Sequence, residues 1–264
     1  MDSVDTHDLI IPYLLRKVTE KAALASYDWI GRGNKEGGDK AAVDSIRVSL
    51  TELKLSGTIV IGEGEKDDAP QLYNGEVFGD RNAAGHLDIA VDPVEGTTFL
   101  AGGQTNAMAV IVTAPKGTMF DPRPAFYMEK FAAPAETRGK IDMGWPTEKK
   151  LQTVARLIEK DLKDLTVFVL DKPRHRGLVE EINEAGARVT LYPAGDVAGA
   201  LMAATPDTDV DVLMGTGGTP EGIISACAIR AMGGEFLGRI NPQLATEIVS
   251  VREAGLDTER WYDR

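Results

Sequence analysis

The chain has 264 residues, of which 43% are hydrophobic and 27% charged, as in ordinary globular proteins, and no apolar run approaches the ~20 residues of a membrane span. A formal net charge of −12 argues against nucleic acid and anionic membrane surfaces as partners. The single cysteine, Cys227, excludes an internal disulfide and indicates a reducing cytoplasm. It lies in an apolar stretch and is expected to be a small core residue. The acidic start, MDSVDTHDLIIPYLL, is not expected of a signal or transit peptide.

The first half of the chain mixes helical and strand patterns. Apolar or small residues recur at helical spacing from Leu14 to Trp29, which predicts a helix over 8–30. The glycine-rich segment GRGNKEGGDK, residues 31–40, is expected to form a loop. The other expected elements are a helix over 39–53 and strands over 57–61, 87–91, 107–113 and 125–131, the last two joined by a turn at Lys116-Gly117. Residues 1–145 are therefore predicted to be an α+β domain with antiparallel pairing.

Strands and helices alternate, with short loops, after about residue 145. The expected elements are strands over 166–171, 186–193 and 209–215 and helices over 173–185, 196–204 and 220–234, with helix ends at Gly186 and Gly233-Gly234. Such alternation predicts a parallel sheet with right-handed crossovers. Residues 146–264 are therefore expected to be a second, α/β domain.

Acidic loops follow the predicted strands, at the ends where α/β sheets place their sites. They read GEGEKDD (62–68), DPVEGTT (92–98), AGD (194–196) and GTGGTPEG (215–222). In DPVEGTT, Asp92 and Glu95 are held together by Pro93 and Gly96, and carboxylates this close repel unless a cation or proton lies between them. An apolar strand has no structural need for this pair. Oxygen ligands without Cys or His favour Mg²⁺ or Mn²⁺ over zinc.

A divalent-metal site with a hydroxyl beside it suits the hydrolysis of a phosphate ester. Backbone N–H groups of the glycine-rich GTGGTPEG can bind a phosphate. The bases Lys172, Arg174 and Arg176 in LDKPRHRG are placed to bind a second one. Such local charges would overcome the net charge of −12 for an anionic substrate.

Taken singly, some of these motifs can also be interpreted as purely structural features. GEGEKDD can be a solvated acidic loop, KPRHRG an ordinary basic helix N-terminus and GRGNK a helix-capping loop. The histidines His7, His86 and His175 are expected on the surface or in loops, because none has metal-ligand spacing.

Taken together, these motifs resemble the class II fructose-1,6-bisphosphatases of bacteria, within the lithium-sensitive, metal-dependent sugar and inositol phosphatases. The resemblance runs from residue 18 to residue 239 and is carried by GTIVIGEGEKDDAP, DIAVDPVEGTT, FYMEK, DKPRH and GGTPEG. It implies a layered αβαβα architecture and a cytoplasmic, homo-oligomeric phosphoric monoester hydrolase that uses Mg²⁺ or Mn²⁺. The implied reaction removes the 1-phosphate of fructose 1,6-bisphosphate to give fructose 6-phosphate and phosphate, a step of gluconeogenesis, through in-line attack of a metal-activated water.

The resemblance also implies a role for each matching residue. The catalytic residues would be Lys35 on the scissile phosphate and Thr97, which orients the attacking water with help from Asp67. The metal ligands would be Asp39, Glu63, Asp92, Glu95 and Glu221, with Asp92 nearest the reacting phosphate. The sugar bisphosphate would be bound by Glu95, Gly96, Thr97, Tyr127, Lys172, Pro173, Arg174, Ala194, Gly195, Asp196 and Gly218.

Three departures from the family pattern stand out. Ala194 replaces an acid that some relatives carry, which could alter recognition of the sugar hydroxyls. Asn34 replaces the Asp commonly found in GRGDK, outside the expected ligands. Relatives also continue beyond the position of Arg264, so the second domain is expected to be incomplete at its C-terminus, with a sheet edge left uncovered.

Two further hypotheses follow from these departures. Ala194 motivates a different substrate, sedoheptulose 1,7-bisphosphate or another sugar phosphate. The early stop motivates a truncated fragment that binds metal and sugar phosphate without catalysis. The chain keeps all the acidic residues that are expected to bind the metal, and it keeps the Thr97 hydroxyl. This favours the hypothesis of an active fructose-1,6-bisphosphatase.

Overall fold

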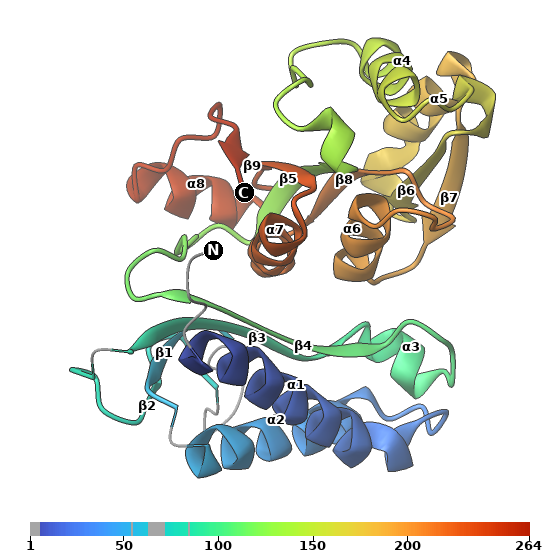
Figure 1. The fold of residues 1–264 in the computed structure, drawn as a ribbon. Coiled ribbons are helices and arrows are strands. Elements are labelled where there is room, and N and C mark those ends of the chain that lie inside the picture. The colour runs from blue at the N-terminus through green and yellow to red at the C-terminus, as the bar shows by residue number, and fades with distance from the viewer. Residues whose placement is uncertain (1–5, 54, 63–71, 84) are drawn as a thin grey trace. The chain divides into compact units, whose positions relative to one another are not determined.

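A computed structural model describes residues 6–53, 55–62, 72–83 and 85–264, without the side chains of residues 6–10. The chain forms two compact units, residues 1–121 and 122–264, and each contains helices packed on a mixed sheet (Figure 1). The mixed α/β class expected from the sequence is confirmed. The division falls before residue 145, because residues 127–133 pair with strands of the second unit. The layered αβαβα architecture implied by the resemblance stays a prediction.

The first unit is a four-stranded sheet of order β2-β1-β3-β4 that packs on two helices. Strands β1 and β3 are parallel, whereas β4 runs antiparallel to β3. Residues of α1, α2 and the sheet share one core, in which Val18, Ile46, Ile59 and Ile89 are inaccessible to solvent. The elements are α1 (Thr6–Ser26), η1 (Tyr27–Trp29), α2 (Lys35–Glu52), β1 (Gly57–Ile61), β2 (Val77–Phe78), β3 (Leu87–Glu95), α3 (Thr97–Ala101) and β4 (Met108–Pro115).

The glycine-rich segment 31–40 is not a loop throughout, because α2 already begins at Lys35. The Asn34 side chain caps the helix by accepting a hydrogen bond of 2.9 Å from the Gly37 N–H, as small polar residues do at this position. Gly37 and Gly38 lie inside the helix because they pack closely. A Cβ on Gly37 would lie 2.2 Å from Cζ3 of Trp29, and one on Gly38 would lie 2.5 Å from Cδ2 of Leu100.

Strand β3 also extends beyond the predicted end at residue 91. It continues to Glu95, and its pairing with β4 shifts register between Asp92 and Glu95. Such an irregularity re-aims side chains, and bulges of this kind are frequent next to active sites. The chain turns only at Gly96, whose φ of +79° is unfavourable for other residues.

The second unit is built on a six-stranded sheet of order β10-β9-β5-β8-β6-β7. Strands β8, β6 and β7 are parallel, as predicted, whereas β5 is antiparallel to both β8 and β9. The predicted turn at Lys116-Gly117 is present, but β4 and β5 belong to different sheets and do not pair. The elements are β5 (Tyr127–Ala133), η2 (Ala135–Thr137), α4 (Thr147–Leu157), η3 (Leu162–Asp164), β6 (Thr166–Leu170), η4 (Pro173–His175), α5 (Arg176–Ala185), β7 (Arg188–Tyr192), α6 (Asp196–Ala204), β8 (Val212–Gly218), α7 (Thr219–Met232), β9 (Glu235–Ile240), α8 (Ala245–Glu253) and β10 (Tyr262–Asp263).

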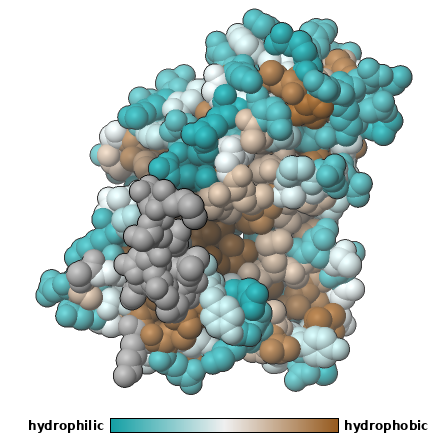
Figure 2. Space-filling view, in the orientation of Figure 1, coloured by the Kyte–Doolittle hydropathy of each residue, from teal (hydrophilic) through white to brown (hydrophobic). Residues whose placement is uncertain are grey.

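Helices cover both faces of this second sheet (Figure 1). Phe131 of β5 packs with residues of α4 and α5, whereas its neighbours Met128 and Ala132 pack with residues of α6 and α7. This is the alternation of side chains that a buried strand requires. Hydrophilic residues predominate on the surface over α4 and α5 (Figure 2), as expected of amphipathic helices that cover a sheet. None of the described helices combines the length and apolar character that crossing a membrane requires.

Glu247 on α8 fastens the start of β5. Its side chain is fully buried, and Oε1 accepts hydrogen bonds from the N–H groups of Phe126 and Tyr127 at 2.6 and 2.8 Å. Oε2 accepts from the N–H groups of Gln243 and Leu244 at 2.8 and 3.4 Å. One carboxylate therefore satisfies four backbone donors that belong to two distant segments.

Candidate active site

The acidic pair of DPVEGTT lies in the irregular end of β3. A carboxylate oxygen of Asp92 and one of Glu95 lie within 4.8 Å of each other, and Glu95 is only 5% exposed. The Asp92 carboxylate also accepts a hydrogen bond of 3.1 Å from the Val94 N–H, which orients it. Two oxygen-bearing groups this close, one of them buried, form a donor set suited to a hard divalent cation.

The loop before α2 brings Lys35 to the same end of the first unit. The N–H groups of Gly31 and Gly33 donate to the carbonyls of Leu100 and Ala101, each at 2.9 Å, so this loop is bound to α3. Nζ of Lys35 then donates to Oγ1 of Thr98 at 2.8 Å. Thr98 follows Thr97 in sequence. The positively charged ammonium group of Lys35 therefore lies beside the hydroxyl groups that follow the acidic pair. Asp39 lies one turn further along α2.

Replacing Gly37 by Ala is expected to disturb this arrangement. The new methyl group would overlap three ring atoms of Trp29, all within 2.6 Å, and this clash outweighs the better helix propensity of Ala. We expect a loss of roughly 1–3 kcal/mol in the free energy of unfolding. The matched control is Gly177→Ala in α5, where nothing lies within 4 Å of the new atom. Urea unfolding should show that only Gly37→Ala is destabilised; equal stability of both variants would contradict the close packing.

In the second unit, Thr216 near the end of β8 connects three side chains. Its carbonyl accepts hydrogen bonds from Nε and Nη2 of Arg174 at 3.0 and 2.7 Å. Its N–H donates to Nε2 of His175 at 2.8 Å, and its hydroxyl accepts from the Asn241 side chain at 2.9 Å. The Arg174 guanidinium lies 5.2 Å from the centre of the Tyr127 ring, within the range of a cation–π contact. Arg174 and His175, which follow β6, are therefore held against the end of β8, and Arg174 also contacts the start of β5.

Glycines at the end of β8 make room for two carboxylates. A Cβ on Gly217 would lie 1.9 Å from Oδ2 of Asp196, and one on Gly218 would lie 1.9 Å from Oε2 of Glu221. Asp196 is the first residue of α6, and Glu221 lies in the first turn of α7. Any side chain at these two glycines would displace an acid, so the glycines of GTGGTPEG are required by the packing of Asp196 and Glu221.

The histidines were expected on the surface or in loops. His86 does lie in a loop, directly before β3, and His175 ends the short turn η4, but both side chains are buried, each only 4% exposed. Because Nε2 of His175 accepts from the Thr216 N–H, the neutral ring must carry its proton on Nδ1, which donates to the Leu170 carbonyl at 2.7 Å. Burial lowers the pKa of His175 from its ordinary value, and the nearby Arg174 charge lowers it further, whereas the Leu170 and Thr216 backbone groups and Asp196 oppose this change.

This lowered pKa predicts a loss of stability in acid. Below about pH 6.5 the unfolded chain binds a proton that the folded chain resists, so stability falls as pH decreases, by up to about 1.4 kcal/mol per pH unit. We expect His175→Gln to have a lower free energy of unfolding than the wild type at pH 8. On acidification, the free energy of unfolding of the variant should decrease less than that of the wild type. Urea unfolding of both proteins between pH 8 and pH 5 tests this. Parallel pH dependences would show that His175 is not responsible.

A hollow of about 940 Å³ in the first unit contains none of the predicted site residues. It lies between the C-terminal half of α2 and the region around β2. A hollow of ≈ 10 Å³ in the second unit, in contrast, is lined by Lys130, His175 and Asp196, among others. The volume of a hollow therefore does not indicate where the predicted site residues lie.

A scan of protein families matches residues 11–264 to the family described as bacterial fructose-1,6-bisphosphatase, glpX-encoded. The chain belongs to this family. It is 47% identical over 224 residues to fructose-1,6-bisphosphatase 1 class 2 of Escherichia coli K12 and to fructose-1,6-bisphosphatase class 2 of Shigella flexneri. The matched region covers 85% of this chain and 66% of each relative, so the chain spans just under two thirds of their length.

Among solved structures, an extragenic suppressor from Pyrococcus furiosus aligns with a TM-score of 0.39 and 14% identity, over 74% of this chain and 70% of that chain. A likeness of this size supports no statement about fold or function.

Within this member of the glpX-encoded family, the predicted site residues fall into three groups. Glu63 and Asp67 lie outside the described residues. Lys35, Asp39, Asp92, Glu95, Gly96 and Thr97 lie on α2, β3 and the start of α3. Tyr127, Lys172, Pro173, Arg174, Ala194, Gly195, Asp196, Gly218 and Glu221 lie at the start of β5, after β6, before and at the start of α6, and around the junction of β8 with α7. The structure thus brings each of the last two groups to one region of its own unit.

Sequence reasoning missed the residues that support these groups. His175 lies in the recognised motif DKPRH and Lys130 in FYMEK, but neither motif indicated that these side chains are buried. Glu247 belongs to no motif that was singled out. Cys227, expected to be a small core residue, is only half-buried. Burial raises the pKa of its thiol, which is unfavourable for a nucleophile.

Proposed function

We propose that this chain is a metal-dependent phosphatase that hydrolyses the 1-phosphate of fructose 1,6-bisphosphate. The observation that carries the proposal is the Asp92–Glu95 carboxylate pair in the irregular end of β3. Two carboxylates at this separation, one of them buried, are stabilised by a divalent cation, and the family to which the chain belongs is described as a fructose-1,6-bisphosphatase. Since the relatives are longer than this chain, their activity comes to it only as part of this proposal.

The proposed ligands of Mg²⁺ or Mn²⁺ are Asp39, Glu63, Asp92, Glu95 and Glu221. When bound, such a cation would polarise the phosphoryl oxygens and lower the pKa of a coordinated water. Thr97, with Asp67, would orient the attacking water as a hydrogen-bonding group. Lys35 would place its charge on the oxygens of the scissile phosphate, and its hydrogen bond to Thr98 supports this position.

The proposed sugar and far-phosphate site lies in the second unit. Arg174 keeps two donors on the Thr216 carbonyl, which fixes the guanidinium plane, and its contact with Tyr127 orients that ring. Tyr127, Lys172 and Arg174 would hold the sugar and its far phosphate, to which Arg presents a rigid fork of donors, and Pro173 would line the same site. Ala194, Gly195, Asp196 and Gly218 would surround the sugar, while Glu95, Gly96 and Thr97 would contact the reacting end.

Ala194 supports a second candidate, the hydrolysis of sedoheptulose 1,7-bisphosphate or another sugar phosphate. The residue lies half-buried in the short segment between β7 and α6, directly before Gly195 and Asp196. Without a polar side chain there, the site has one fewer group with which to reject a longer sugar.

The test is phosphate release by the purified chain from fructose 1,6-bisphosphate and from sedoheptulose 1,7-bisphosphate, with Mg²⁺, with Mn²⁺ and with EDTA. We expect turnover that requires a metal and a higher kcat/KM for the fructose compound. A higher kcat/KM for sedoheptulose 1,7-bisphosphate would favour the second candidate. No turnover, with binding of fructose 6-phosphate still measurable by calorimetry, would favour the non-catalytic fragment.

We further propose a cytoplasmic location, which the single cysteine supports. Assembly into a homo-oligomer stays a prediction that light scattering on the purified chain would test.

A further inference from the structure

Lys130, in the middle of β5, is buried in a way that no role proposed above uses. Its side chain is 1% exposed, and its Nζ lies 2.5 Å from Oδ2 of Asp196, whose side chain is 8% exposed. Lys130 shares a strand face with Met128 and Ala132, which pack against α6 and α7. The ion pair therefore joins the centre of the sheet to the first residue of α6, inside the core of the second unit.

The surrounding backbone is shaped around this pair. A Cβ on Gly217 would lie 1.9 Å from Oδ2 of Asp196 and 3.1 Å from Nζ of Lys130. A Cβ on Gly222 would lie 3.0 Å from Cε of Lys130. Two glycines from the end of β8 and the start of α7 thus leave space for the lysine and for the carboxylate that it binds.

Stability alone does not explain such a pair. Removing two charges from water is costly, and apolar residues of similar volume stabilise a core as well or better. The adjacent hollow of ≈ 10 Å³ has room for about one water, so bulk solvent cannot take the place of the ammonium group. A buried pair of this kind is better suited to holding one carboxylate in a defined orientation.

We propose that Lys130 is a positioning residue for the sugar site: by binding Oδ2 of Asp196, it orients the carboxylate to accept a hydrogen bond from a hydroxyl group of the sugar. This inference rests on the proposed function, because it takes the segment 194–196 as part of the sugar site. Asp196 is the group that would touch the substrate, and Lys130 acts through it. A carboxylate oriented in advance binds a hydroxyl without rearranging, which lowers the cost of binding.

The test compares Lys130→Met, Asp196→Asn and the double variant with the wild type. Each single variant leaves one buried charge without its partner, and we expect Tm to fall by roughly 6–20 °C. The double variant removes both charges, so most of this loss should be recovered. KM for fructose 1,6-bisphosphate should rise by about 10- to 100-fold in all three variants, because none holds an oriented carboxylate. Inhibition by inorganic phosphate, which has no sugar hydroxyl, should stay unchanged.

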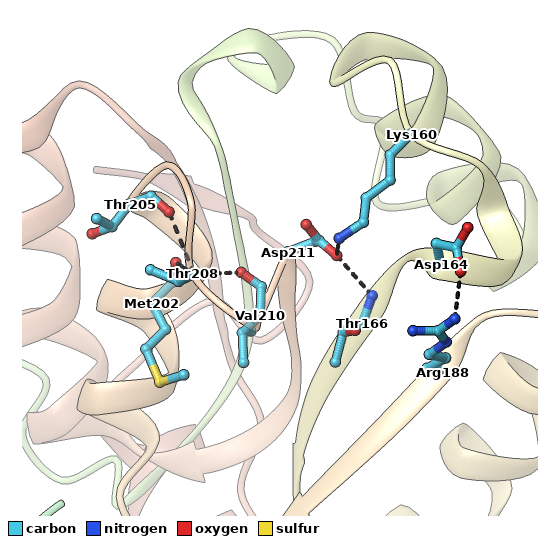
Figure 3. A network of polar contacts seen from close by, with 9 residues as sticks. All are labelled: Lys160, Asp164, Thr166, Arg188, Met202, Thr205, Thr208, Val210 and Asp211. Atoms are coloured by element: carbon cyan, nitrogen blue, oxygen red, sulfur yellow. Dashed lines mark hydrogen bonds and ion pairs between the residues drawn. The ribbon is translucent and has the colours of Figure 1, made fainter.

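The matched control is Lys160→Met. Nζ of Lys160 lies 2.7 Å from Oδ2 of Asp211, which also accepts a hydrogen bond of 2.8 Å from the Thr166 N–H (Figure 3). This ion pair lies where β6 and β8 begin, at the opposite end of these strands from Thr216 and Gly218. This variant loses a part-buried ion pair of the same unit, and we expect a smaller fall in Tm with KM unchanged.

The outcomes separate positioning from stability. A double variant that regains both Tm and the wild-type KM would show that the pair is only structural and would overturn the proposal. So would an inhibition constant for phosphate that rises together with KM, or a double variant that is no more stable than the single ones. If the wild type does not hydrolyse fructose 1,6-bisphosphate, the proposed function fails instead. The KM comparison is then made with the sugar phosphate that it does hydrolyse, or as Kd for fructose 6-phosphate; an unchanged value in the variants overturns the proposal.

Discussion

Phosphate release from fructose 1,6-bisphosphate is expected to fall at least about 100-fold when Asp92 is replaced by Asn. Asn has the same shape and can still accept the hydrogen bond from the Val94 N–H, so the end of β3 should keep its form. What it lacks is the negative charge beside Glu95 that attracts a divalent cation. The loss should therefore appear in kcat with Mg²⁺ and Mn²⁺ alike, measured at saturating substrate.

A second readout separates lost metal binding from lost folding. Addition of Mn²⁺ should raise the Tm of the wild type, since a ligand that binds the folded state stabilises it, and should raise that of Asp92→Asn much less. The matched control is Asp44→Asn on α2, where the carboxylate is exposed and 3.7 Å from Nζ of Lys40. It should retain both activity and the metal-dependent shift. Equal activity of Asp92→Asn and the wild type would remove Asp92 from the site.

Replacing Glu247 by Gln is expected to destabilise the second unit strongly. The carboxylate accepts four backbone hydrogen bonds, two on each oxygen. A glutamine can accept on one side only, and its NH₂ group would face two N–H donors on the other. Leaving two buried donors unsatisfied should cost roughly 3–5 kcal/mol in the free energy of unfolding.

The consequences of Glu247→Gln should reach the proposed sugar site. Tyr127 is one of the donors, so its backbone would shift, and KM should rise together with the loss of stability measured by urea unfolding. Glu253→Gln, an exposed change at the end of the same helix, serves as control and should stay within about 0.5 kcal/mol of the wild type. A stable Glu247→Gln variant would mean that the four donors find other partners.

Much of the fold could be read from periodicity and turn chemistry. The helix over 196–204 and the ends at Gly186 and Gly233 were predicted correctly, because a left-handed glycine after an apolar period ends a helix in a recognisable way. The start of α2 was missed, because Gly37 and Gly38 suggested a loop. They are explained only by Trp29 and Leu100, contacts that no local pattern contains.

The candidate site shows the same limit. Asp92 and Glu95 could be singled out, because two acids in an apolar strand conflict with burial. Lys130 and Glu247 conflict with burial as strongly, but the partner of Lys130 is 66 residues away in sequence, and Tyr127, one of the donors to Glu247, is 120 residues away. No local pattern indicates pairs at such separations. The placement of β5 was missed for a related reason, since strand pairing across a long separation leaves no local trace.

The place of β5 in its sheet has a consequence for synthesis on the ribosome. Both neighbours of this strand, β8 and β9, are encoded after three further helices and two further strands. As the chain emerges, Tyr127–Ala133 must wait with unpaired backbone groups and an exposed Phe131, while the parallel pair β6 and β7 can already associate. Strands in this condition readily pair with the wrong chain. The second unit should therefore depend on chaperones until Ile240, the end of β9, has left the exit tunnel. The strands described in the first unit are all made before residue 116, so that unit can fold well before then.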